Sequence, residues 1–126
     1  MRSTLRHTLA GAAFTLMATA CGPFHRGGQA DAVVVFHNQS IDQADVYAIG
    51  AGGQPVRVGT VFGNRTETLH IPSDVIAAAN RVNIVVRVFP SSKIVASGPF
   101  SLGPGDSMDV TRPSQENLIA VLPSRQ

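Results

Sequence analysis

The chain has 126 residues, of which 44% are hydrophobic and 14% charged, and its formal net charge is +2. Its single cysteine, Cys21, has no partner within the chain, so a disulfide-stapled fold is excluded. Arg2 and Arg6 precede Cys21, whereas all eight acidic residues follow it, leaving eight basic and eight acidic residues after the cysteine. This balance excludes the basic surface that a nucleic-acid partner requires.

The N-terminus has the order of charges and apolar residues expected of an export signal. Arg2 and Arg6 are followed by an apolar run over 9–20, which ends directly before Cys21. A run of about a dozen residues is too short for a membrane-spanning helix, which needs roughly 20. We therefore predict a signal peptide over 1–20 that is cut between Ala20 and Cys21.

A cysteine directly after this run resembles the lipobox-type signal of bacterial lipoproteins. The resemblance implies a diacylglycerol on the Cys21 sulfur, cleavage after Ala20 and acylation of the new amino group. Two or more acyl chains hold a protein stably on a membrane, since each buried methylene contributes about 0.8 kcal/mol. Ala18 and Ala20 also fit an ordinary A-x-A cleavage site, and the alternative is a soluble secreted protein with a free thiol.

The same resemblance predicts the cellular location. Gly22 follows the cysteine, at a position where an aspartate often retains Gram-negative lipoproteins at the inner membrane. We therefore expect a cell-envelope protein that is lipid-anchored, in the outer membrane facing the periplasm rather than in the inner membrane. Residues 21–31 are rich in glycine and predict a flexible, lipidated tether. The remainder, 32–126, is the size of one domain.

The domain sequence is dominated by β-strand patterns. Segments rich in valine, isoleucine, threonine and phenylalanine alternate with glycine, proline, asparagine and aspartate. The predicted strands are Ala32–His37, Ala44–Gly50, Pro55–Phe62, Thr66–Ile71, Arg81–Phe89, Lys93–Phe100, Ser107–Thr111 and Leu118–Leu122. In two of them alternation predicts one apolar face, formed by Val82, Ile84, Val86 and Val88 in one strand and by Val56, Val58, Thr60 and Phe62 in the other.

The connections agree with an all-β fold. Glycine and asparagine at 51–54 and 63–64 favour hairpin turns, and Ser73–Ala79 predicts one short helix that Ser73 begins and Asn80 ends. We predict an immunoglobulin-like or transthyretin-like antiparallel β-sandwich of about seven to eight strands with one short crossover helix. A small barrel is the second possibility.

The segment from Val34 to Pro72 also resembles a group of small uncharacterised bacterial lipoproteins. The shared features are an asparagine after the first strand, a V-Y strand, a glycine-rich turn and an R-x-G-T-V strand. This resemblance implies the anchored β-sandwich architecture and brings no activity, cofactor or substrate.

The sequence shows no pattern of a catalytic or metal centre. It has no G-x-S-x-G elbow and no H-x-x-x-H or C-x-x-C spacing. His37 and His70 fall at predicted strand ends, where a solvated or hydrogen-bonded imidazole is expected. We therefore predict no catalytic residue, no metal, no cofactor and no enzymatic activity.

Outward-facing cations are the remaining candidates for a binding surface. Arg57 and Arg87 oppose valine faces, Arg65 lies beside a turn, and with Tyr47 they could form a shallow patch for an anionic or peptide ligand. The alternative is a solvated sheet face whose arginines pair with acidic neighbours such as Glu67.

These observations predict a non-enzymatic structural or protein-interaction module, anchored to a membrane by its acyl chains. Its expected partner is another envelope protein, contacted through edge strands. The alternative function is a domain that binds a small envelope ligand, either a peptide or a glycan. A chain with no tryptophan and one tyrosine lacks the aromatic platforms that glycan sites usually have.

Overall fold

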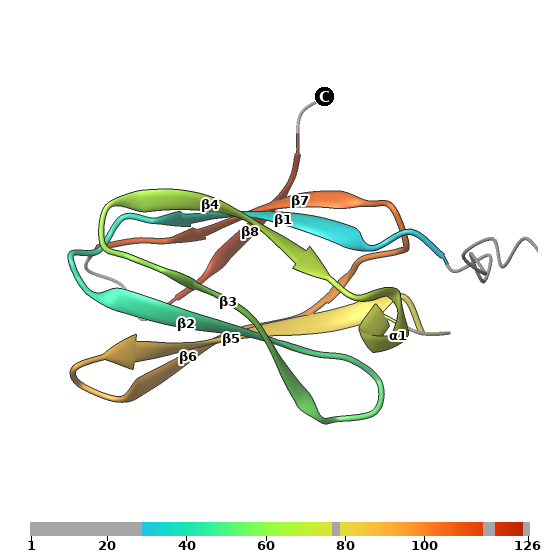
Figure 1. The fold of residues 1–126 in the computed structure, drawn as a ribbon, viewed down its shortest axis with the longest axis horizontal. Helices are drawn as coiled ribbons and strands as arrows, with labels where there is room; N and C mark the ends of the chain where they lie inside the picture. The colour runs from blue at the N-terminus through green and yellow to red at the C-terminus, as the bar shows by residue number, and fades with distance from the viewer. Residues whose placement is uncertain (1–28, 77–78, 115–117, 125–126) are drawn as a thin grey trace, which may run out of the picture.

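The computed structural model describes residues 29–76, 79–114 and 118–124, and in them the chain forms a β-sandwich (Figure 1). The predicted eight strands and one short helix are all present, with ends that differ from the predictions by at most a few residues. The elements are β1 (Ala32–Asn38), β2 (Gln43–Ile49), β3 (Pro55–Val61), β4 (Arg65–Ile71), α1 (Ser73–Ile76), β5 (Arg81–Phe89), β6 (Lys93–Ser101), β7 (Ser107–Arg112) and β8 (Ala120–Pro123).

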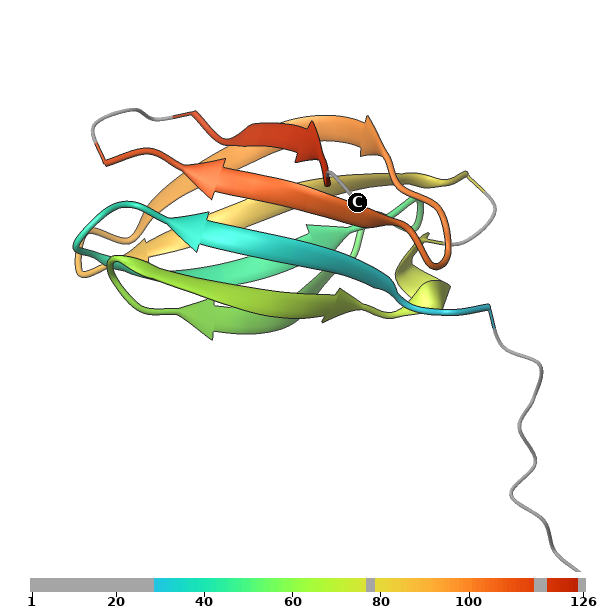
Figure 2. The same ribbon diagram turned by 90° about the horizontal axis from the view of Figure 1, so that it is seen from above.

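Two four-stranded sheets make up the sandwich. Sheet A has the order β4-β1-β7-β8, and sheet B has the order β3-β2-β5-β6. Figure 2 shows the two layers from above. Because the strands divide into two separate sheets, the barrel alternative is wrong.

One strand pair departs from the predicted antiparallel arrangement, since β1 and β7 are parallel. The cause is the path of the chain between the sheets. β6 ends at Ser101 opposite Arg81, so the connection to sheet A leaves from the end of the sandwich where β1 also begins. β7 must then run in the same direction as β1.

The core is formed where alternate residues of both sheets meet. The predicted apolar face of β5 is confirmed, because Val82, Ile84, Val86 and Val88 are all buried. In sheet A the inward residues of β1 and β7 complete this core, with Phe36 the largest fully buried side chain. Each Å² of apolar surface removed from water contributes roughly 25 cal/mol. The packed core between the two sheets is therefore the main source of the stability of the domain.

The predicted alternation in β3 is wrong after Val58. Val46 pairs with Gly59 while the next residue, Tyr47, pairs with Arg57, so Val58 is an extra residue in a β-bulge. A bulge reverses the faces of the residues that follow it. Val61 is therefore buried, whereas Thr60 and Phe62, which were predicted to share the face of Val56, point outward on the same side as Arg57.

The helix connects the two sheets, as predicted. α1 covers Ser73–Ile76 rather than Ser73–Ala79, and residues 77–78 lie outside the described part. The Ser73 N–H donates to the Asp31 carboxylate at 3.1 Å, and Asn80 has the left-handed backbone expected of a residue that ends a helix (φ 47°). Within the described ranges no helix is long and apolar enough to cross a membrane.

The chain enters the domain at one end of the sandwich, which we call the proximal end. There Gly105 N–H donates to the Ala30 carbonyl at 3.2 Å, and Val33 N–H donates to the Asp106 carbonyl at 2.8 Å. Figure 2 shows β1 beginning at this end, beside α1. The predicted signal peptide, Ala20, Cys21 and the tether up to residue 28 lie outside the described residues.

The opposite end, which we call the distal end, joins the loops after β1, β3 and β7. Asn64 N–H donates to the Ser40 carbonyl at 2.8 Å, and Gln39 N–H donates to the Arg112 carbonyl at 3.0 Å. Three connections that are far apart in sequence are therefore held together at the distal end.

Candidate functional site

The predicted surface patch is assembled on the outer face of sheet B. Arg57 lies directly opposite Tyr47 in the pairing of β3 with β2, and Asp45 lies opposite Arg87 in the pairing of β2 with β5. Arg57, Tyr47 and Arg87 therefore share one face, as the sequence predicted. Arg65 belongs to β4 of the other sheet and is not part of this patch.

Asp45, which the sequence did not single out, organises this face. Its Oδ1 lies 2.9 Å from Arg57 Nη2 and accepts a hydrogen bond from the Thr60 hydroxyl at 2.6 Å, and Arg57 also contacts that hydroxyl. The Thr60 hydrogen bond is the largest influence on the carboxyl and, with Arg57, lowers the pKa of Asp45 although burial opposes the shift. The carboxylate in turn raises the pKa of Arg57.

The lowered pKa makes this network sensitive to acid. A carboxyl group whose pKa is lower in the folded protein contributes stability above its unfolded pKa, which is about 3.9 for aspartate. The stability that Asp45 contributes is lost as the pH falls through the pKa of this carboxyl group in the folded protein. At neutral pH Arg57 is therefore already paired.

Arg87 is also engaged within the sheet. Its guanidinium lies over the Phe89 ring, 5.2 Å from the centroid, in a cation–π contact. Because Asp45 neutralises Arg57, less positive charge remains for a ligand than the sequence suggested.

The outer face of sheet A carries a second polar cluster, centred on His37. Its Nε2 lies 3.4 Å from Asp109 Oδ1, and its Nδ1 lies 3.1 Å from Thr66 Oγ1. An ionised carboxylate can only accept a hydrogen bond. In the neutral imidazole, therefore, the Nε2–H of His37 donates to Asp109, and Nδ1 accepts from the Thr66 hydroxyl. The prediction of a hydrogen-bonded imidazole is confirmed for His37.

A hydroxyl residue, a histidine and an aspartate also form the nucleophilic triads of hydrolases. Here, however, the imidazole and the carboxylate are partly exposed to solvent. The side chains of His37 and Asp109 are 36% and 35% exposed, so water screens the imidazole and the carboxylate. His70 pairs with Val33, four positions before His37 in β1, and is not brought to His37. In the residues that the structure covers, no group of three or more His, Cys, Asp or Glu side chains could hold a metal ion.

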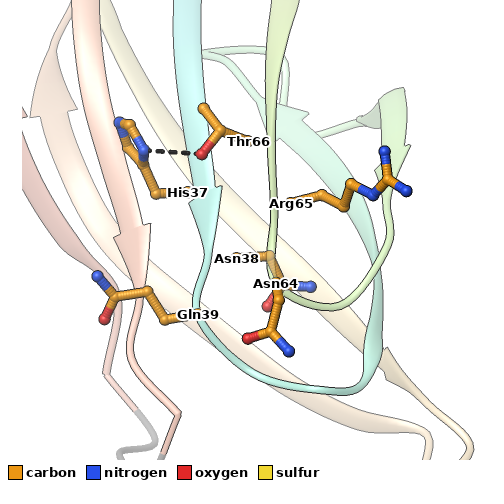
Figure 3. Close-up of a pocket in the computed structure, with 6 residues that line it drawn as sticks. All are labelled: His37, Asn38, Gln39, Asn64, Arg65 and Thr66. Atoms are coloured by element: carbon orange, nitrogen blue, oxygen red, sulfur yellow. Dashed lines mark hydrogen bonds between the residues drawn. The ribbon is translucent and has the colours of Figure 1, made fainter.

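A pocket of about 240 Å³ opens beside this cluster, at the distal end between β1 and β4. We call it the distal pocket, and Figure 3 shows its lining. Its walls are His37, Asn38, Gln39, Asn64, Arg65 and Thr66. The lining supplies carboxamides, an imidazole, a hydroxyl and a guanidinium, and it contains no carboxylate.

The buried lining residue Asn38, which is 2% exposed, holds the loops around the pocket together. Asn38 Nδ2 donates to three carbonyl oxygens from two loops, those of Asp42 at 2.8 Å, Val61 at 3.2 Å and Phe62 at 3.2 Å. Its Oδ1 accepts from the Ser40 N–H at 3.2 Å and from Arg112 Nη1 at 3.2 Å. One buried carboxamide therefore fixes the shape of the distal end.

Arg112 places a buried cation behind Asn38. It is 7% exposed, it forms no ion pair with a described residue, and its Nε has no hydrogen-bond partner among them. Asn38 was noted from sequence as the asparagine after the first strand, and Arg112 was not singled out. No local pattern could have joined them, because they lie 74 residues apart.

Among the large apolar side chains that are exposed in the described residues, two lie in the distal loops tied to Asn38. Ile41, in the loop after β1, is 83% exposed, and Phe62, directly after β3, is 60% exposed. Both loops are tied to Asn38, through the carbonyls of Asp42 and Phe62. We call Ile41 and Phe62 the distal tip.

Comparison with known proteins supports the architecture alone. No family model matches the chain, and no curated protein matches it. Its fold is similar to that of a protein from Eubacterium rectale solved by NMR, with a TM-score of 0.50 over 83% of this chain and 97% of that one. The two sequences are 11% identical. This likeness shows the fold and no activity.

Proposed function

We propose that the protein is a lipid-anchored, non-enzymatic interaction module of the cell envelope. In this proposal Cys21 carries the acyl chains, residues 21–31 form the tether, and the domain presents its distal end to an envelope partner. The observation that carries the proposal is that the chain enters β1 at the proximal end, opposite the distal tip. An anchor before β1 therefore leaves the distal end pointing away from the membrane.

The dimensions fit this arrangement. A flexible tether of about eleven residues has an end-to-end distance of about 18 Å, and the seven residues of β1 add about 23 Å. The distal tip then stands beyond the lipid headgroups, where a partner protein can reach it. Confinement by the acyl chains raises the effective concentration of the domain for a partner in the same membrane.

The distal end is a better contact surface than the edge strands that the sequence suggested. Three of the four edge strands are short or irregular. β8 has four residues and ends at Pro123, β6 contains Pro99 and a left-handed Gly98, and β3 begins at Pro55 and contains a bulge. Short strands, prolines and backbone irregularities hinder the addition of a partner strand. The distal tip offers exposed apolar side chains of the kind that protein interfaces bury, in loops whose carbonyls are bonded to Asn38.

A pair of photo-crosslinking variants tests the proposal in intact cells. A photoreactive amino acid at Ile41 is expected to give a discrete adduct with an envelope protein, because the distal tip faces that partner. The same group at Gln54, which is exposed in the turn between β2 and β3 near α1, is the matched proximal control and should not give this adduct.

Removing the anchor completes the test. Cys21→Ala in the Ile41 background should release the chain and abolish the adduct. The same adducts from Ile41 and Gln54, or none from Ile41 in a chain that remains on the membrane, would contradict the proposal.

The second candidate function is a small-ligand binding domain. The observation that favours it is the distal pocket, with its wall of hydrogen-bonding side chains.

A further inference from the structure

We propose that the distal pocket binds the carboxylate group of a small ligand, a property that goes beyond the tethered interaction module and does not depend on the anchor. The first argument is the composition of its wall. Arg65 is exposed and forms no ion pair within the described residues, with Glu67 or with any other carboxylate. Among the lining side chains, those of Gln39, Asn64 and Arg65 offer N–H donors, and no lining residue is acidic.

The second argument is the charge behind the wall. Arg112 is buried behind Asn38, and no described carboxylate neutralises it. A buried charge is only weakly screened, so its field adds to that of Arg65 at the pocket. Asp109, the carboxylate that contacts the lining residue His37, already accepts a hydrogen bond from its imidazole. The charge at the pocket is therefore complementary to an anion.

The third argument is the geometry of the donors. Asn64 has a left-handed backbone (φ 55°), and its N–H is bonded to the Ser40 carbonyl, so the turn that carries its side chain is fixed. Figure 3 shows Gln39 and Asn64 below His37, with Arg65 extending from β4 on the side away from the imidazole. A planar guanidinium pairs with a carboxylate through two parallel N–H···O bonds.

This layout predicts how a ligand is held. Its carboxylate pairs with Arg65, and the adjoining polar groups reach the carboxamides of Asn64 and Gln39. About 240 Å³ accommodates one amino-acid residue or one sugar ring. A carboxylate of this size has two sources in an envelope, the C-terminal residue of a peptide and an acidic sugar.

Titration of the full chain in neutral detergent, followed by amide NMR, tests the proposal without a membrane or a partner. The probes are N-acetylalanine and glucuronate, and the neutral controls are N-acetylalanine amide and glucose. We expect saturable shifts of the amide signals of residues 37–39 and 64–66 with at least one acid and not with its neutral counterpart. Binding of N-acetylalanine identifies the peptide source, and binding of glucuronate identifies the sugar source.

Three variants locate the site. Arg65→Gln should weaken binding at least tenfold, whereas Arg81→Gln, the same change at an exposed arginine of β5, should leave it unchanged. Asn64→Gly keeps the left-handed backbone available and should weaken binding severalfold. The amide spectrum of each variant reports its fold.

The proposal is overturned if neither acid binds, if the neutral compounds bind equally well, or if Arg65→Gln binds as the unaltered chain does. Each of these results leaves the crosslinking prediction for Ile41 standing, so the two proposals fail separately.

Discussion

Replacing Asn38 with leucine is expected to destabilise the domain by about 4 kcal/mol. The side chain is buried and makes hydrogen bonds to three carbonyl oxygens, one backbone N–H and Arg112. Leucine leaves these groups without partners in an interior that water does not reach. The loss of the acceptor beside the Arg112 guanidinium contributes most to this destabilisation, because a buried cation is the costliest group to leave without a hydrogen-bond partner. Urea unfolding followed by circular dichroism measures the change.

We call the hydrogen-bond network of Asn38 and Arg112 the clasp. Two further variants distinguish the loss of the clasp from a general effect of leucine at the distal end. Gln39→Leu alters an exposed neighbour and should change the free energy of unfolding by less than about 0.5 kcal/mol. The double variant Asn38→Leu with Arg112→Met removes the cation as well as its acceptor. It should be less destabilised than the sum of the single variants by at least about 1 kcal/mol. Additive losses, or a loss below about 1 kcal/mol for Asn38→Leu alone, would show that the clasp does not hold the distal end.

Gly63→Ala is expected to destabilise the domain by about 3 kcal/mol, although it adds a single methyl group. A Cβ at this position would lie 2.1 Å from the Ile41 carbonyl oxygen, 2.5 Å from its carbonyl carbon and 2.8 Å from its Cα. All three are backbone atoms, so no side-chain rotation relieves the clash. The loop after β1 must move, and with it the hydrogen bond from Asn64 N–H to Ser40.

Gly52→Ala is the matched control for this substitution. Gly52 also lies in a turn, but nothing approaches within 4 Å of its Cβ position, so we expect a change of less than about 0.5 kcal/mol. In thermal melts of a domain of this size, 3 kcal/mol corresponds to a midpoint lowered by about 12 to 20 °C. Equal midpoints for the two variants would contradict the close contact between Gly63 and Ile41.

The strands could be predicted because the signal for each is local. In β5 the alternation of Val82, Ile84, Val86 and Val88 with outward residues follows the pleat of a half-buried strand. The same reasoning failed after Val58 because a bulge depends on the partner strand, which the residues of β3 do not reveal. The parallel pairing of β1 with β7 was missed because the route between the two sheets determines it.

The candidate site could be predicted only in part. Arg57, Tyr47 and Arg87 lie on one face, since adjacent strands with matching outward faces bring their residues together, whereas Arg65, which was grouped with them, lies in the other sheet. The distal pocket was missed, because its structure depends on contacts across long stretches of sequence. His37 lies 29 residues from Thr66 and 72 residues from Asp109. Asn38 and Arg112 each appear in the sequence as one polar residue among others at the end of a strand.

The anchor at Cys21 is the claim on which the proposed function depends most. The most direct test is the intact mass of the native chain, extracted from membranes and compared with a Cys21→Ala chain from the same cells. The account predicts a species that begins at Cys21, carries the mass of a diacylglycerol and at least one further acyl chain, and is lost from the membrane fraction in the variant. A dissolved native chain whose mass shows an unmodified cysteine would contradict it.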